Sequence, residues 1–195
     1  RTQNIKVHNK KVFKNKTNSK RGELSEESKQ HILRFYHDDL HLWKRASTNV
    51  IYLYWGTGIE NATELSKLCV HSWKALNPTW VIVELNDLNL EEHVSDMTFL
   101  KRMKSKMSLT SYSDLVRLSL LLENGGVWAD STVFCLKPLN EWLHDSCPNG
   151  FFAFHHPSRK ISSWFLYAHR DSVIIQKWYD AMVQYWSDGS QTLGY

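Results

Sequence analysis

The stretch TSYSDLVRLSLLLENGGVWADSTV, residues 110–133, decides the fold of this chain. Its apolar residues recur at helical spacing, which predicts an amphipathic helix that begins near Thr110. The predicted inner face consists of four leucines: Leu115, Leu118, Leu121 and Leu122. The Asn-Gly-Gly sequence at 124–126 ends the helix, because glycine readily takes the left-handed conformation of a helix cap. Residues 127–132, which include Asp130, are then a predicted short strand.

Two apolar runs upstream have the composition of buried strands, VIYLYW at residues 50–55 and WVIVEL at residues 80–85. Both are rich in β-branched and aromatic residues, as strands of parallel sheets are. Between them, Asn61 or Thr63 caps a helix that ends at Asn77-Pro78. The residues expected to face inward on this helix are Leu65, Leu68, Cys69, Trp73 and Leu76. Strand, helix and strand in this order predict a parallel, right-handed unit of the α/β class.

Two more strands, at residues 151–154 and 161–168, and an amphipathic helix at 171–186 complete the pattern. Five strands interleaved with helices favour one α/β domain at residues 49–195. We expect it to be Rossmann-like, with a mostly parallel sheet and flanking helices.

The N-terminal segment differs in charge from the rest of the chain. Residues 1–21 carry eight Lys and Arg and no acid, although the formal net charge of the whole chain is only +4. We assign residues 1–22 to a basic leader and residues 23–48 to an N-terminal helix that starts at Ser25. Such a leader can contact an anionic membrane surface or a nucleic acid. We favour a solvated segment without a nucleic-acid partner. Phe13 is the only aromatic residue among these charges, whereas segments that bind single strands combine charge with several aromatic residues.

The composition indicates a globular protein: 195 residues, 42% of them hydrophobic, with nine Trp. No apolar run approaches the about 20 residues of a membrane-spanning helix. Localisation stays open between the cytoplasm or a membrane surface in a bacterium and the Golgi lumen in a eukaryote. Because the chain begins with Arg1, we expect it to be a piece of a longer product.

Cysteine, tryptophan and histidine give few functional indications. Cys69, Cys135 and Cys147 are widely spaced, so we expect buried or free thiols, with a disulfide between the last two as the alternative. Four tryptophans in periodic apolar patterns are expected in the core: Trp73, Trp80, Trp164 and Trp178. His155 and His156 lack the spacing of a metal motif, which favours surface positions over a ligand role.

Three charged residues of the central stretch make the candidate site. Asp114 and Arg117 are three apart on the predicted helix and share a face near its N-terminal end. Asp130 lies where a parallel strand ends, and ligands of open α/β sheets bind outside such ends. Together these residues could hold the hydroxyls of a sugar and a metal-bound diphosphate. A purely structural ion pair between Asp114 and Arg117 is the alternative.

The pattern S-D-x-x-R at 113–117, followed by apolar positions and G-G-x-W-x-D at 125–130, is specific. It resembles the nucleotide-sugar glycosyltransferases of the GT-A fold, and within them the capsular polysaccharide synthesis proteins, relatives of glycosyltransferase family 32. The resemblance extends to IYLYWGTG at 51–58 and to the segments 69–87 and 162–182, so it covers about residues 50–195. It implies a GT-A-like catalytic domain, here truncated at its C-terminal end.

This resemblance implies roles for residues around the donor. Tyr54 and Trp55, at the end of the first strand, are placed to stack on the nucleotide base. Asp114 and Arg117 correspond to residues that hold hydroxyls of the ribose or the donor sugar. Residues 86–87, just after the second strand, either reach the ribose or only form a turn.

The resemblance also implies a divalent cation, Mn²⁺ or Mg²⁺, that bridges the diphosphate and is held by Asp130, the first acid of a DxD motif. Thr132 replaces the second acid, in the D-x-T form of the capsular synthesis subgroup, and removes one carboxylate ligand. Ser163, with Ser162, falls where relatives place polar donor-site residues.

The implied reaction transfers a sugar from a nucleoside-diphosphate sugar, with UDP favoured over GDP, to a hydroxyl of a glycan or polysaccharide, with retention of configuration. One alternative is a catalytically silent relative that binds nucleotide sugar or carbohydrate, which the neutral Thr132 favours. The other is a nucleic-acid-binding α/β domain, which rests on the basic leader alone.

Overall fold

The computed structural model describes residues 25–26, 28, 49–147, 149–158 and 161–188. It divides into two units, Arg1–Leu40 and His41–Tyr195. In the first unit the Ser25 hydroxyl accepts a hydrogen bond from the Ser28 amide at 3.2 Å, as expected of a helix start. The basic leader and nearly all of the predicted N-terminal helix lie outside the described residues. All elements below belong to the second unit.

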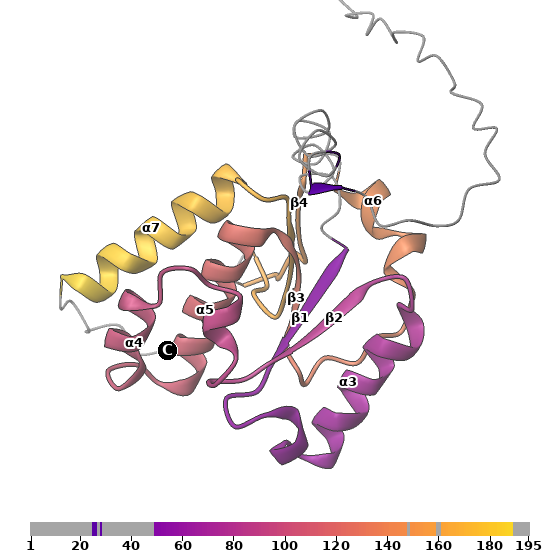
Figure 1. Ribbon diagram of the computed structural model, residues 1–195, viewed down its shortest axis with the longest axis horizontal. Coiled ribbons are helices and arrows are strands. Elements are labelled where there is room, and N and C mark those ends of the chain that lie inside the picture. The colour runs from indigo at the N-terminus through magenta and orange to yellow at the C-terminus, as the bar shows by residue number, and fades with distance from the viewer. Residues whose placement is uncertain (1–24, 27, 29–48, 148, 159–160, 189–195) are drawn as a thin grey trace, which may run out of the picture. The chain divides into compact units, whose positions relative to one another are not determined.

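Five strands are interleaved with helices along the second unit, except that β5 follows β4 directly (Figure 1). In chain order the elements are β1 (Val50–Tyr54), η1 (Ile59–Asn61), α3 (Glu64–Leu76), β2 (Val81–Leu85), η2 (Leu90–Glu92), α4 (Thr98–Lys104), α5 (Leu109–Asn124), β3 (Gly126–Ala129), η3 (Leu139–Glu141), α6 (Leu143–Ser146), β4 (Phe151–Ala153), β5 (Phe165–Ala168) and α7 (Val173–Ser187).

The strands form one sheet in the order β2-β1-β3-β5-β4. Strand β1 lies parallel to both β2 and β3, whereas β5 pairs antiparallel with β3 and with β4. Only β5 therefore runs against the others, and the predicted α/β fold with a mostly parallel sheet is confirmed. Because β1, β2 and β3 point the same way, their carboxyl ends meet at one edge of the sheet, where ligands bind in such folds.

The sheet is covered on both faces, and β1 shows how its residues divide. Tyr52 packs into the core beneath α4, α5 and α7, whereas Ile51 and Leu53 pack into the core on the side of α3 and α6. This alternation follows from the strand period of two. Both faces are apolar, which is why the sequence of β1 has no polar position.

Helix α5 is buried on nearly every side, because α4 and α7 pack against it on the face away from the sheet. Of the predicted inner leucines, Leu115, Leu118 and Leu121 are fully buried, and Leu122 is half-buried. The predicted glycine break is confirmed, since Gly125 has a φ of 67° directly after the last helical residue. The chain then reverses at once into β3.

The predicted inner face of α3 is partly wrong. Leu65 and Leu68 are 66% and 59% exposed, and the face turned to the core consists of Ser66, Cys69, Val70, Ser72 and Trp73. The indole N–H of Trp73 donates to the carbonyl of Val133 at 2.8 Å, which fixes the rotation of the helix. Two serines, Ser66 and Ser72, belong to the buried face, so hydrophobicity alone pointed to the wrong side of the helix.

Several predicted strands are shorter in the structure. Residues 130–132 form a turn, in which the amide of Val133 donates to the carbonyl of Asp130 at 2.8 Å. Strand β2 lies at the edge of the sheet with Val81 60% exposed, so its prediction as a buried strand is wrong. Residues 161–164 lie outside β5, and Trp164 is 38% exposed, which overturns its assignment to the core.

The predictions for the other tryptophans, the cysteines and the two histidines are confirmed. Trp73 and Trp80 are buried in the core, and Trp178 packs against it, half-buried. The three cysteines are buried free thiols, without the alternative disulfide. His155 and His156 are exposed, as expected. Within the described residues, no helix is long and apolar enough to cross a membrane.

Ser108 caps α5, since its hydroxyl accepts a hydrogen bond from the Ser111 amide at 3.1 Å. We expect Ser108→Ala to lower the free energy of unfolding by about 1 kcal/mol, because an amide of the first turn loses its acceptor. Ser108→Asp, which keeps an acceptor, is the control. Urea denaturation measures all three proteins, and equal stability of parent and alanine variant would contradict the assignment.

Candidate functional site

A cavity of about 510 Å³ lies at the carboxyl ends of β1 and β3. Tyr54 and Trp55 line it from the end of β1, and Asp130 lines it from the end of β3. Arg117 of α5 forms part of the same wall, together with Thr132 in the turn after β3. The structure therefore brings together most of the predicted site residues, from segments up to about 80 positions apart in the sequence.

Arg117 is the centre of a buried ion cluster. Its Nη1 donates to Oδ1 of Asp114, and its Nη2 donates to Oδ1 of Asp130 at 2.7 Å. The guanidinium also lies 5.0 Å from the ring centre of Trp128, within range of a cation–π contact. The side chain is only 4% exposed, and a buried charge of this kind needs its partners. The predicted ion pair between Asp114 and Arg117 is present, and a donor-binding role for these two residues stays a prediction.

Asp130 divides its two oxygens between structure and cavity. Oδ1 accepts from Arg117 Nη2 and from the indole N–H of Trp128, both at 2.7 Å. Neither bond involves Oδ2, and the side chain is 33% exposed. One oxygen thus holds the carboxylate in place, and the other is open to a ligand or a hard cation.

A second polar cluster, formed by Tyr54, Asp87 and Lys104, lines the same cavity. The Tyr54 hydroxyl donates to Oδ1 of Asp87 at 2.8 Å, and Nζ of Lys104 lies 2.9 Å from Oδ2 of Asp87. Burial, and then the bond to Asp87, raise the pKa of the Tyr54 hydroxyl. It therefore stays protonated at neutral pH and remains a donor to the carboxylate. A side chain at Gly56 would bring a Cβ within 3.3 Å of Asp87 Oδ2, so this position is tightly packed.

Two predicted site residues lie outside the cavity lining, Asp114 and Ser163. Asp114 is 8% exposed and occupied by Arg117. Since α5 begins at Leu109, Asp114 is its sixth residue, beyond the first turn where the helix dipole acts. Ser162 is buried, and its amide donates to the carbonyl of Phe154 at 2.8 Å.

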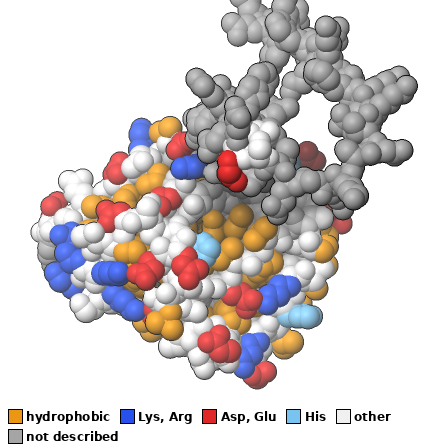
Figure 2. All heavy atoms as spheres, viewed as in Figure 1, with side chains coloured by type: hydrophobic (Ala, Val, Ile, Leu, Met, Phe, Trp, Pro, Cys, Tyr) orange, Lys and Arg blue, Asp and Glu red, His pale blue; other side chains and the backbone are white. Residues whose placement is uncertain are grey.

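Residues that were not singled out also line the cavity: Lys104, Tyr112, Ser113 and Ser131. Lys104 is the last residue of α4, which carries Lys101 and Arg102 in the same turn. Figure 2 shows Lys and Arg side chains gathered over the α4 region with acids beside them. The sequence shows that these three cations lie close together, but not that Lys104 lines the cavity. Of residues 86–87, Asn86 caps a turn by accepting from the Leu88 amide, whereas Asp87 lines the cavity.

Known proteins resemble this chain at low identity. Over 179 residues it is 24% identical to the glycosyltransferase afumC of Aspergillus fumigatus, which covers 80% of this chain and 46% of that protein. Over 192 residues it is 25% identical to the O-glycosyltransferase PaGT of Phomopsis amygdali, covering 88% of this chain and 47% of that protein. The chain thus spans about half the length of these curated relatives.

Among solved structures, the PaToxG glycosyltransferase has a similar fold, with a TM-score of 0.57 at 13% sequence identity. The match covers 86% of this chain and 74% of that one. The family described as capsular polysaccharide synthesis protein matches residues 1–195, the whole chain. The resemblance carried by the central stretch is confirmed, and the chain belongs to the capsular polysaccharide synthesis protein family.

Proposed function

We propose that this chain is the donor-binding part of a glycosyltransferase that acts in polysaccharide or glycan synthesis. The donor is a nucleoside-diphosphate sugar, with UDP favoured over GDP. The observation that carries the proposal is the cavity at the carboxyl ends of β1 and β3, which is lined by Asp130. Oδ2 of Asp130 takes no part in the two hydrogen bonds that hold Oδ1. Ligands of open α/β sheets bind at this edge. The names of both curated relatives and of the structural neighbour support it.

Side chains of the cavity suit the parts of such a donor. Trp55, half-buried beside the cavity, offers an aromatic face to the base. Lys104 and Ser113 are polar groups within the lining that suit phosphate and ribose oxygens. Tyr54 contributes its ring, while its hydroxyl is committed to Asp87.

The charges of the lining favour a divalent cation on the diphosphate, Mn²⁺ or Mg²⁺. Both cationic side chains of the described lining, Arg117 and Lys104, are already paired with carboxylates. A diphosphate therefore needs a further positive charge. The described residues contain no cluster of three His, Cys, Asp or Glu for a metal. Asp130 alone would hold the cation, which fits a metal that keeps diphosphate oxygens and water as its other ligands. Bound there, it would neutralise charge on the leaving group.

In the proposed reaction the acceptor oxygen forms a bond to the anomeric carbon, the bond from that carbon to the diphosphate oxygen breaks, and the hydroxyl proton is released. Arg117 contributes by holding Asp130 in place, and the negative charge of Asp130 would attract the cation to the point where the leaving group departs. Retention of configuration stays a prediction from the resemblance. The anomeric coupling of the product in a proton NMR spectrum decides it.

Lys104→Ala tests the donor site. We expect the dissociation constant of the preferred nucleotide sugar to rise by about tenfold. The Lys104 ammonium has three N–H donors, so it can contact the donor while it pairs with Asp87, and that charge-assisted contact is lost. Lys101→Ala is the matched control. Lys101 lies on the same helix as Lys104, but it pairs with Glu91 of η2 and does not line the cavity. Calorimetric titration of UDP-sugars and GDP-sugars, with and without Mn²⁺, measures the effect.

The outcomes separate the candidate functions. No binding of any nucleotide sugar by the parent protein would overturn the proposal. If Lys104→Ala and Lys101→Ala weakened binding equally, the donor would not bind in this cavity. Donor binding without turnover would identify the silent relative, which the neutral Thr132 favours.

A further inference from the structure

A second cavity, of about 370 Å³, lies beside the turn that follows β3. Its lining is apolar except for Lys137 and the buried thiol of Cys135. Phe134 and Leu136 contribute from the segment after the turn, and they are 55% and 86% exposed. They continue the apolar wall of the cavity, and contiguous apolar surface of this kind marks interaction and ligand sites.

Aromatic rings form the firm part of this wall. Phe154 and Trp164 stack with ring centres 4.9 Å apart and an angle of 13° between their planes. Trp142 packs against Phe154 at 5.9 Å and edge-on against Phe152 at 5.2 Å. Because each of these rings packs against another ring, the cavity is preformed. A ligand therefore pays a smaller entropic cost for ordering side chains when it binds.

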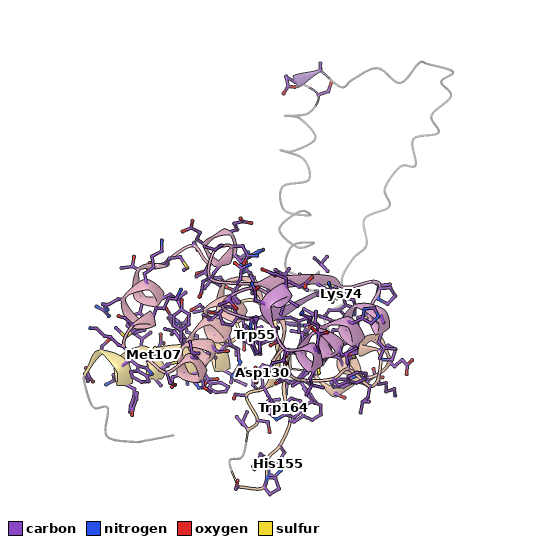
Figure 3. The ribbon with its side chains drawn as sticks, turned by 90° about the horizontal axis from the view of Figure 1, so that it is seen from below. Trp55, Lys74, Met107, Asp130, His155 and Trp164 are labelled. Atoms are coloured by element: carbon purple, nitrogen blue, oxygen red, sulfur yellow. The ribbon has the colours of Figure 1, made fainter. Side chains whose placement is uncertain are left out.

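Only one turn separates this cavity from the donor cavity. Thr132 lines the donor cavity, and Val133, the next residue, lines the apolar one. The amide of Asp130 donates to the carbonyl of Trp164 at 2.9 Å, so the metal-binding candidate and the aromatic wall are joined directly. Figure 3 shows Asp130 between Trp55 and Trp164, with His155 at the tip of a segment that projects away.

We propose that the apolar cavity binds the acceptor, and that the acceptor is a hydroxyl-bearing small molecule with a compact apolar ring body. This inference rests on the donor site of the proposed function and replaces the glycan acceptor named there with an apolar one. The volume lies in the range of small-molecule sites, about 300–1,000 Å³. A sugar ring seated here would leave its hydroxyls without partners, which is costly, whereas an apolar ring buries its surface favourably. The hydroxyl of such a molecule is presented toward the turn and the donor.

The test uses 4-methylumbelliferone, a flat aromatic molecule with one hydroxyl, and maltose as the sugar probe. Phe134→Glu places a carboxylate in the apolar cavity at a half-exposed position, where folding tolerates it. Leu68→Glu is the matched control, because Leu68 is 59% exposed on α3 and lines neither cavity. Each protein is titrated with both probes and with UDP in a calorimeter.

We expect the parent to bind 4-methylumbelliferone, Phe134→Glu to weaken that binding by about tenfold or more, and Leu68→Glu to leave it unchanged. UDP binding stays the same in all three proteins. UDP binding without probe binding overturns the inference and leaves the proposed function standing. Maltose binding that Phe134→Glu abolishes, or probe binding that Leu68→Glu weakens equally, also overturns it. Loss of UDP binding in the parent overturns the proposed function itself.

Discussion

Asp130→Asn is expected to lower the rate of sugar transfer by about 10²- to 10³-fold, because a neutral amide holds the cation that would neutralise the leaving group much more weakly than a carboxylate does. The amide keeps an oxygen that accepts from Arg117 and from the Trp128 indole. The fold is retained, because Asp114 still neutralises the guanidinium. What is lost is the negative charge on the exposed oxygen. Initial rates with the preferred donor, at saturating Mn²⁺, measure the effect.

Asp145→Asn is the control for this experiment, since Asp145 is exposed on α6 and lines neither cavity. Its rate stays within about twofold of the parent, as is usual for surface changes away from a site. An Asp130→Asn enzyme of parental rate would show that the carboxylate takes no part in the reaction.

Arg117→Met is expected to reduce the free energy of unfolding by about 3–5 kcal/mol, because it leaves buried carboxylates without their cation. Adding Asp114→Asn to this variant removes one of those uncompensated charges, and most of the lost stability returns. Arg117→Lys recovers only part of it, since an ammonium lacks the planar fork that bonds both acids at once. Urea denaturation of the four proteins yields the values.

Arg102→Met is the matched control. Arg102 is exposed on α4 and lies 4.9 Å over the ring of Phe99, so its removal costs less than about 1 kcal/mol. If Arg117→Met were as stable as this control, the ion cluster would not stabilise the fold. A role of Arg117 in binding substrate would then be favoured over a structural one.

The order and type of the elements were predictable because strong local signals define them. The continuous apolar residues of β1 require a sheet covered on both sides, and the glycine at 125 requires a sharp end to α5. The inner face of α3 was not predictable from hydrophobicity. It depends on the indole of Trp73 reaching the carbonyl of Val133, 60 residues away. Trp164 was misplaced for a related reason, since its periodic apolar neighbours do not show that it lies beside an open cavity.

For the candidate site, sequence reasoning identified the residues carried by the central stretch and by the end of β1. Asp130, Tyr54 and Trp55 share one cavity because the carboxyl ends of parallel strands coincide, and Arg117 reaches it from α5. Lys104 was missed, since its place depends on how α4 packs against α5 and on the loop after β2. No spacing in the sequence encodes that packing.

The turn after β3 has a thermodynamic consequence. It is tied to the segment before β5 through Trp164, to α3 through Trp73 and to β1 through the Ser131 hydroxyl. It forms part of the wall of both cavities, so a ligand in one that favours one arrangement of the turn alters the affinity of the other. Linkage makes this effect reciprocal: the factor by which a first ligand changes the binding of a second equals the factor in the opposite order. Donor and acceptor would then bind as a coupled pair, with a coupling set by the backbone of this turn.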